Sequence, residues 1–310
     1  MSNKKITEID FVRSVLMCIV ILVHIVSLGE QYPSAKTAAF TFFMPAFLII
    51  TGYLVNINKS LRQFSLYILR IALPYIIMVT AFSLASLVMP VRDGLSELSV
   101  PALAERVFVT SIGPYWFLYD MIVCGVAYYA VFSLAPKSLG LASRLSLLAF
   151  LLYVESWFIP LLTFGDASLY FIGVVLRQTG VGFVSAFRPS FFSLLPFAVL
   201  IVQRDLWNKW LCLLLPFFAI SFLVWCHNVF PLRIRDVMNY LGHNTLPIYI
   251  FHPIFTMLSK FYLPIFAFDP TGILHATTTV ALSFVGSIII AKTLDKTGVS
   301  CIFGTKALIR

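Results

Sequence analysis

The sequence predicts an all-α, polytopic bundle of transmembrane helices. Hydrophobic residues make up 60% of its 310 residues and charged residues only 11%, whereas a soluble protein is about 45–50% apolar and about 25% charged. Apolar runs of about 20 residues, the length that crosses a bilayer as a helix, recur along the chain. They lack the period-two alternation of a membrane barrel, so helices are the expected spanning element.

About ten runs have this character. The expected spans are residues 11–29, 37–56, 65–90, 115–135, 143–162, 167–187, 190–204, 208–227, 243–264 and 272–293. The pair 167–187 and 190–204 fits least well, because the first run contains Arg177 and the second is short.

The placement of basic residues supports this count. With ten spans and a cytoplasmic N-terminus, most lysines and arginines fall on the cytoplasmic side, as the positive-inside rule requires. Removing the span 167–187 would invert everything after it and place the basic C-terminal tail outside. We therefore expect both termini in the cytoplasm. The net charge of +9 then reflects this bias and contact with anionic lipid rather than nucleic acid binding.

The chain is expected to form one integral-membrane domain, residues 1–310, with no appended soluble domain. The first span lacks a small-residue cleavage site and carries two ionisable groups, so it does not resemble a cleaved signal peptide. The largest segment between spans, 91–114, is expected outside the membrane as a short lid or re-entrant piece.

Arg13 and His24 are the first ionisable pair to explain, because a charge inside a bilayer costs several kcal/mol. They are eleven residues apart, so an α-helix places them on nearly one face, about 16 Å apart along its axis. Arg13 would lie at the cytoplasmic end and His24 near the outer end. The alternative is an arginine that reaches lipid phosphates and a structural histidine.

Arg70 has a similar predicted depth at the cytoplasmic side of the third span. Pro74 follows four residues later, where it kinks the helix. Arg13 and Arg70 could together bind a phosphorylated cytosolic ligand, because guanidinium groups bind phosphate well.

Two carboxylates lie in predicted spans. Asp120 has the predicted depth of His24, so it could orient the imidazole. Alternatively, it pairs with an outer base such as Arg106. For Glu155 the first expectation is a structural pair with Arg177 on the next span, and the alternative places it beside His24 or an acceptor.

The remaining candidates lie around the same predicted region. His252 lies deep in a span and either lines a cavity or makes a structural hydrogen bond. Trp116 belongs either to an aromatic belt or to a sugar-binding surface. His227 and His275 are expected at the interface. No phosphate loop, dinucleotide motif, nucleophile elbow or zinc-type spacing is present, so neither a metal site nor a bound cofactor is expected.

The order of several motifs resembles the membrane-bound acyltransferase family 3, the bacterial O-acyltransferases of surface glycans. The motifs are Asp10 and Arg13 followed by His24, "FMPAFLIITGYL" at Phe43–Leu54, Arg70 with Pro74 and Tyr75, Trp116–Leu118, and "LGHNTLPIYIFHP", which contains Tyr249 and His252. The chain departs from the family where many members carry a second arginine, because Tyr67 stands there. Arg62 is the nearest other base.

The resemblance implies a multi-pass enzyme of the bacterial inner membrane. Its donor would be a cytosolic acyl-CoA, usually acetyl-CoA, and its acceptor a hydroxyl of a surface or lipid-linked polysaccharide. Arg13 and Arg70 would bind the donor. His24, Asp120 and Glu155 would be catalytic, with His24 a general base or a transient acyl carrier. Trp116, Tyr249 and His252 would line the acceptor cavity. Oligomeric state is left open.

Two other classes of function fit parts of the sequence. Intramembrane ionisable groups also suit a proton-coupled transporter or a glycan-lipid exporter. Inverted repeats would favour such a carrier, and the sequence shows none. A scaffold of a polysaccharide assembly complex would not explain a histidine and an arginine on one helix face.

Overall fold

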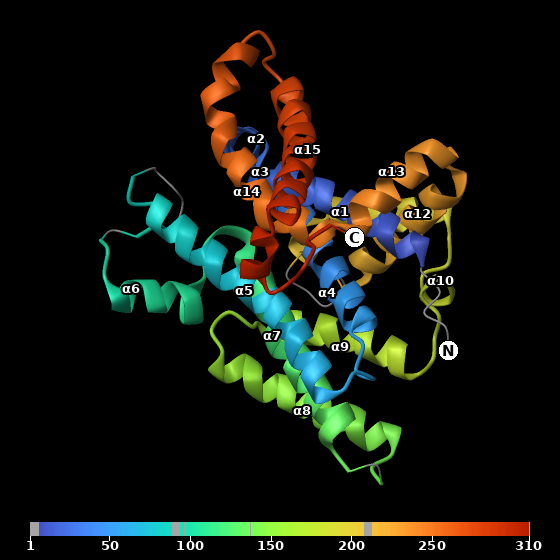
Figure 1. The fold of residues 1–310 in the computed structure, drawn as a ribbon. Coiled ribbons are helices and arrows are strands. Elements are labelled where there is room, and N and C mark those ends of the chain that lie inside the picture. Colours follow the sequence, from blue (N-terminus) through green and yellow to red (C-terminus); the bar gives the residue numbers. More distant parts are fainter. Residues whose placement is uncertain (1–5, 89–93, 96, 137, 208–212, 310) are drawn as a thin grey trace. The chain divides into compact units, whose positions relative to one another are not determined.

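A computed structural model describes residues 6–88, 94–95, 97–136, 138–207 and 213–309. Within these ranges all regular elements are helical (Figure 1). The predicted all-α class is therefore confirmed. The first residues of the expected span 208–227 and part of the 91–114 segment lie outside the described residues.

Several helices have the length and composition of membrane spans. In the described part of the chain, five qualify: Pro33–Leu54, Leu61–Ala85, Gly113–Leu134, Leu141–Phe158 and Ile273–Thr297. The apolar helices Phe191–Val202 and Leu214–Val229 are shorter. Large apolar side chains such as Phe150, Trp157 and Phe158 are 65–80% exposed, as expected for surfaces that face lipid. These features support a multi-pass membrane protein, whereas the ten-span topology and the side of the termini remain predictions.

The helices group into two compact units. Unit 1 consists of residues 1–47, 180–297 and 307–310, and unit 2 of residues 48–179 and 298–306. The expected single membrane domain, residues 1–310, stays a prediction.

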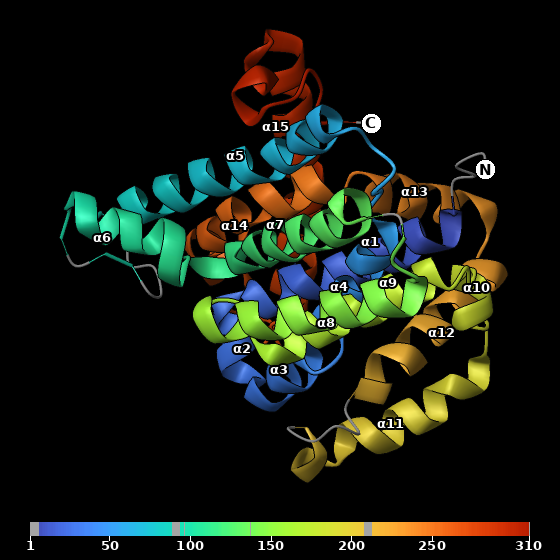
Figure 2. The same cartoon turned by 90° about the horizontal axis from the view of Figure 1, so that it is seen from below.

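Unit 1 is assembled around its first helix. Its helices are α1 (Thr7–His24), α2 (Val26–Gln31), α3 (Pro33–Phe40), the start of α4 (Phe43–Leu54), α10 (Phe183–Ala186), α11 (Leu194–Val202), α12 (Leu214–Val229), α13 (Leu232–His243), α14 (Thr245–Tyr262) and α15 (Ile273–Thr297). Helix α1 contacts α12, α13, α14 and α15. Helices α14 and α15 form a hairpin and run side by side (Figures 1 and 2).

The first expected span ends earlier than the sequence indicated. Helix α1 runs unbroken to His24, and Ile25 then adopts an extended conformation before α2 begins. Because α1 is continuous, its geometry keeps Arg13 and His24 on nearly one face. The chain turns directly after the histidine.

Helix α13 is an element that the sequence did not predict. Residues 228–242 lie between two expected spans, and Arg233, Arg235 and Asp236 make this segment too polar to cross a membrane. The segment instead forms a helix that packs against α1.

The contact between α13 and α1 depends on Gly242. A Cβ atom added there would lie 1.6 Å from the carbonyl oxygen of Asp10 and 2.4 Å from its carbonyl carbon. The two backbones therefore touch, and no other residue fits without moving one helix. This contact fixes His243, the next residue, beside the N-terminal end of α1.

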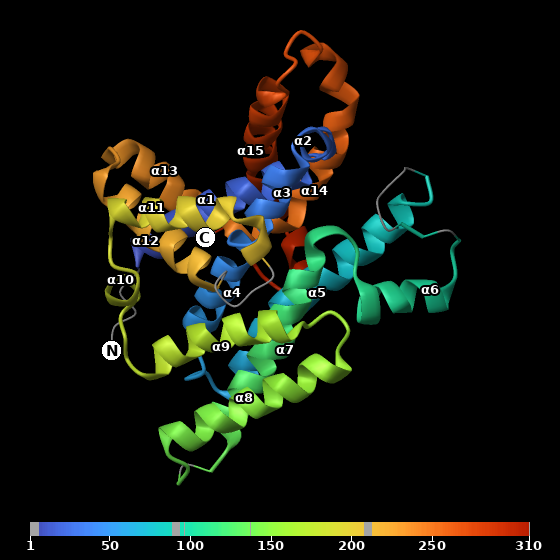
Figure 3. The same cartoon turned by 180° about the vertical axis from the view of Figure 1, so that it is seen from behind.

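Unit 2 contains the rest of α4, with α5 (Leu61–Ala85), α6 (Val100–Glu105), α7 (Trp116–Tyr129), α8 (Leu141–Phe158) and α9 (Phe164–Gln178). Helices α8 and α9 form a second hairpin (Figure 3). Ser60 begins α5 with a capping box in which its hydroxyl and the Gln63 side chain each accept the other's backbone N–H. The expected span 167–187 is a helix of only 15 residues that ends at Gln178.

Glycines also bring α4 and α9 together within unit 2. A Cβ atom on Gly52 would lie 2.1 Å from the carbonyl oxygen of Tyr170, and one on Gly173 would lie 2.0 Å from that of Ile49. Small residues are the usual means of close helix approach in membranes, where apolar burial drives association weakly.

We expect Gly242→Ala to destabilise the protein, because overpacking against a rigid backbone costs about 1–3 kcal/mol. The measurement is the midpoint of thermal unfolding in detergent. Gly140→Ala is the control, because Gly140 has φ −66° and a Cβ atom there would meet no atom within 4 Å. Equal midpoints for the two variants would contradict the close α1–α13 contact.

Candidate active site

His24 is the last residue of α1, and its ring is held by its own helix. Its Nδ1 atom lies 2.6 Å from the carbonyl oxygen of Val20. A carbonyl oxygen only accepts hydrogen bonds, so Nδ1 carries the hydrogen, and in the neutral ring Nε2 then has a free lone pair. The side chain is half-buried. This geometry leaves Nε2, on the side of the ring away from the backbone, available as a base or a nucleophile.

His252 on α14 is held in the same tautomer because a proline, Pro253, follows it in the sequence. Pro253 has no N–H, so the carbonyl of Tyr249, four residues before it, lacks its helical donor. The Nδ1–H of His252 donates to this carbonyl at 2.9 Å. The side chain is fully buried. Its Nε2 atom has no hydrogen-bond partner among the residues that the structure describes.

The two histidines lie next to each other. Their ring centroids are 5.6 Å apart in an edge-to-face arrangement, and Phe40 contacts His24 with ring centroids 6.5 Å apart. Helices α1 and α14 therefore place two imidazoles with unprotonated Nε2 atoms in one apolar environment. The sequence predicted each histidine separately, and the packing of unit 1 brings them together.

Lys36 is a neighbour that the sequence did not single out. It lies on α3, and its side chain passes over Gly29 of α2, where an added Cβ atom would be 3.0 Å from the lysine Cδ. Its ammonium group is close enough to act electrostatically on the His24 ring. The turn after His24, which folds α2 and α3 back, creates this proximity, and the local sequence gives no sign of it.

Arg13 belongs to an ionic cluster at the other end of α1. Its guanidinium lies 3.4 Å from one carboxylate oxygen of Asp10, and Nδ1 of His243 lies 3.5 Å from the other. Asp10 is only 6% exposed. The carboxylate therefore restrains Arg13 and ties α13 to α1, an arrangement that leaves the arginine half-buried at the helix end.

Arg70 lies on α5 in unit 2 and is exposed. Its Nε–H donates to the carbonyl oxygen of Gly304 at 3.4 Å. Residues 298–306 thus contact α5 beside the predicted donor-binding arginine. The joint role of Arg13 and Arg70 stays a prediction, because the two residues belong to different units.

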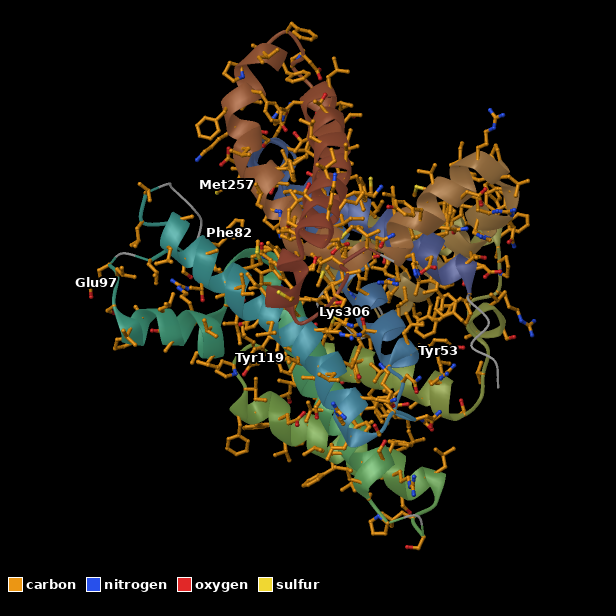
Figure 4. All side chains as sticks on the ribbon, in the orientation of Figure 1. Tyr53, Phe82, Glu97, Tyr119, Met257 and Lys306 are labelled. Atoms are coloured by element: carbon orange, nitrogen blue, oxygen red, sulfur yellow. The ribbon has the colours of Figure 1, made fainter. Side chains whose placement is uncertain are left out.

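Asp120 on α7 is fully buried, and neither of its carboxylate oxygens has a hydrogen-bond partner in the described ranges. Its neighbour Tyr119 is labelled in Figure 4. The alternative pair with Arg106 is not formed, because that guanidinium donates to Thr110 and to the Gly94 carbonyl. The predicted orientation of His24 by Asp120 is untested, and the Val20 carbonyl already occupies Nδ1 of His24.

Glu155 does not form the expected structural pair. Its Oε2 atom is buried without a partner within the described part of unit 2. The guanidinium of Arg177 instead lies over the ring of Tyr53, 5.6 Å from its centroid, and Tyr53 is labelled in Figure 4. The expectation of a Glu155–Arg177 pair is therefore wrong, because α9 turns Arg177 towards α4.

The two aromatic candidates differ in their surroundings. Tyr249 is buried, and its ring centroid lies 5.7 Å from that of His252. Trp116, at the start of α7, is half-buried and contacts Phe117 edge to face. Tyr249 thus joins the histidine pair within unit 1, whereas Trp116 belongs to unit 2.

His227 and His275 are both buried within the protein, and their expected position at the membrane interface stays a prediction. His227 packs its ring against Phe11. The Nε2 atom of His275 lies 3.1 Å from the carbonyl oxygen of Ser259, and its Nδ1 lies 3.4 Å from the hydroxyl of Ser27. Tertiary packing buries them, although each lies near the end of an apolar run.

The His24 site can support proton transfer or nucleophilic attack. Among the described residues, no three histidine, cysteine, aspartate or glutamate side chains converge as a metal site would require.

A family model described as an acyltransferase domain matches residues 6–292. Neither the curated proteins nor the solved structures contain a significant match to the chain. The family match covers nearly the whole sequence, so the chain belongs to acyltransferase family 3 and is a membrane acyltransferase.

Proposed function

We propose that the protein is an O-acyltransferase of the bacterial cytoplasmic membrane, with ten spans and both termini inside. It moves an acyl group, expected to be acetyl, from cytosolic acyl-CoA to a sugar hydroxyl of a surface or lipid-linked polysaccharide. Acyl-CoA is a donor substrate, and no resident cofactor is invoked. Family membership supports acyl transfer, whereas the donor and the acceptor are parts of the proposal.

The observation that carries the proposal is the fixed tautomer of His24. Its Nδ1–H donates to the Val20 carbonyl, so Nε2 is ready to accept a proton or an acyl group. The ring lies at the end of a helix and is half-buried. A substrate could reach it there while the apolar surroundings restrict water.

The donor would bind at the Arg13 end of α1. Guanidinium groups bind phosphate oxygens strongly, and Asp10 holds Arg13 in place. The phosphates of CoA lie at one end of the donor and the thioester at the other. A donor aligned with α1 would therefore place its thioester towards His24. A role for Arg70 in binding the donor is a further part of the proposal.

The acceptor would bind near Tyr249 and Lys36. The charge of Lys36 would stabilise the oxyanion that forms when a hydroxyl attacks the acyl carbonyl. Trp116 could stack on the sugar ring. Catalytic roles for Asp120 and Glu155, which have carboxylate oxygens without partners among the described residues, also belong to the proposal.

One observation also suits the transporter predicted as the alternative. A fully buried carboxyl group without a hydrogen-bond partner, such as that of Asp120, is what a proton relay within a membrane would contain. A proton-coupled carrier would move substrate without consuming acyl-CoA. An acyl-transfer assay with purified protein therefore separates the two functions.

We expect His24→Gln to reduce acyl transfer by about 10²–10⁴-fold, because glutamine keeps the volume but offers no base. The assay follows CoA release and labelled product from radiolabelled acetyl-CoA and lipid-linked glycan, with the protein in nanodiscs. His227→Gln is the matched control, since it also replaces a buried histidine of unit 1. Wild-type protein that is folded but inactive with every acyl-CoA and glycan supplied would argue for the carrier.

We expect Arg13→Gln to raise KM for acyl-CoA by about 10- to 100-fold with little change in kcat, because a hydrogen bond to a charged group contributes about 1.5–3 kcal/mol. Asp10→Asn should raise KM less, since it releases Arg13 but leaves its guanidinium group in place. Arg233→Gln is the control for loss of an exposed cytoplasmic-side charge. A fall in kcat with unchanged KM would remove Arg13 from donor binding.

We expect Lys36→Met to lower kcat by about 10²-fold, as the loss of an oxyanion-stabilising group does. Lys36→Arg should retain most activity because it keeps the charge. Steady-state kinetics with saturating acyl-CoA measure the effect. Lys260→Met is the control for removal of another lysine of unit 1, and an equal loss in that variant would refute a specific role for Lys36.

A further inference from the structure

His252 and His227 each have a buried Nε2 atom without a hydrogen-bond partner among the described residues, and His252 differs in lying against the ring of His24. His252 has 0% exposure, and its Nε2 atom has no hydrogen-bond partner in the described residues. Leaving a polar atom unpaired in an apolar environment costs about 1–3 kcal/mol. An apolar residue at this position would avoid the cost, so a purely structural role does not explain the histidine. The free lone pair therefore points to a ligand that donates a hydrogen bond.

The tautomer of His252 is imposed by Pro253, which leaves the Tyr249 carbonyl without its helical donor. With Nδ1–H committed to that carbonyl, Nε2 can act only as an acceptor. His24 is restrained in the same way by Val20. Two acceptor nitrogens in adjacent rings cannot hydrogen-bond to each other while both histidines are neutral. A molecule that binds there must supply a hydrogen or an electrophilic atom.

We propose that the two histidines divide the reaction between them, with His24 carrying the acyl group and His252 activating the acceptor hydroxyl. This inference rests on the proposed acyl transfer and adds a second catalytic residue to it. The ring centroids, 5.6 Å apart, leave the rings close enough for a hydroxyl held by His252 to meet an acyl group on His24.

The first half-reaction uses His24 alone. The Nε2 lone pair attacks the thioester carbonyl of acyl-CoA, a C–N bond forms, and the C–S bond breaks. CoA leaves as the thiolate. The acyl-imidazolium keeps its Nδ1–H on the Val20 carbonyl. Its positive charge makes the acyl carbon a strong electrophile.

The second half-reaction uses His252. Its Nε2 atom takes the proton of the acceptor hydroxyl as the oxygen attacks the acyl carbon. A C–O bond forms and the C–N bond to His24 breaks, which restores neutral His24 with its Nε2 lone pair. The proton on His252 then passes to solvent, and the CoA thiolate released in the first half-reaction takes up a proton from solvent. The net change is thioester plus alcohol to ester plus thiol.

The experiment separates the two steps by rapid mixing and quenching with radiolabelled acetyl-CoA, first without acceptor and then with lipid-linked glycan. We expect His252→Gln to keep the burst of CoA release and the protein-bound label. Transfer of that label to glycan should fall by about 10²–10⁴-fold. His24→Gln should lose both the burst and the label.

Pro253→Ala provides a second variant that leaves the His252 side chain in place. It returns an N–H to compete for the Tyr249 carbonyl, so His252 loses its fixed tautomer. We expect acylation at the wild-type rate and slowed transfer to glycan. Thermal unfolding midpoints show whether each variant is folded.

Two results would overturn the division of labour while leaving acyl transfer intact. One is a folded His252→Gln variant that transfers label to glycan at the wild-type rate. The other is wild-type protein that transfers acetyl groups without an acyl-enzyme burst, which would indicate direct transfer. Absence of all turnover in wild-type protein would instead count against the proposed function itself.

Discussion

The backbone contact between Gly242 and Asp10 is the constraint on which unit 1 depends. It brings α13 against α1 more closely than any side chain would allow. The carboxylate of Asp10 then lies within reach of Arg13 on its own helix and His243 on the other. Because α14 begins directly after α13, the same contact sets where α14 starts beside α1. The ionic cluster at one end of α1 and the paired histidines thus both depend on the contact between Gly242 of α13 and Asp10 of α1.

Many buried polar side chains among the described residues hydrogen-bond within their own helix. The hydroxyls of Ser14, Thr279 and Ser283 each donate to a carbonyl three or four residues earlier. This local solution suits a membrane, where unsatisfied polar groups are costly and water is scarce. His24 and His252 use it for one nitrogen only. The atoms that remain unsatisfied are therefore informative, since packing alone does not require them.

Unit 2 also combines close apolar packing with a few buried polar atoms that lack a hydrogen-bond partner among the described residues. Gly52 and Gly173 let α4 and α9 touch, and aromatic and aliphatic side chains fill the space around Tyr128 and Tyr170. Asp120 and Glu155 have carboxylate oxygens without hydrogen-bond partners in the part of the chain described. Two acids in such a position are costly for folding, which is consistent with a role in binding or proton transfer.

The sequence by itself determined the helical class, the membrane character and the candidate residues of α1. Long apolar runs can satisfy their backbone in lipid only as helices, and the spacing of Arg13 and His24 fixes their shared face. It also carried the motifs of the acyltransferase family. It did not predict α13, because the charges of this segment exclude a membrane span although it forms a helix that packs against α1. It also predicted a pair between Glu155 and Arg177 that does not form. Only the tertiary structure placed His252 beside His24, because α1 and α14 are distant in sequence. It also placed Lys36 near His24, because that proximity depends on where α1 ends and how α2 and α3 follow it.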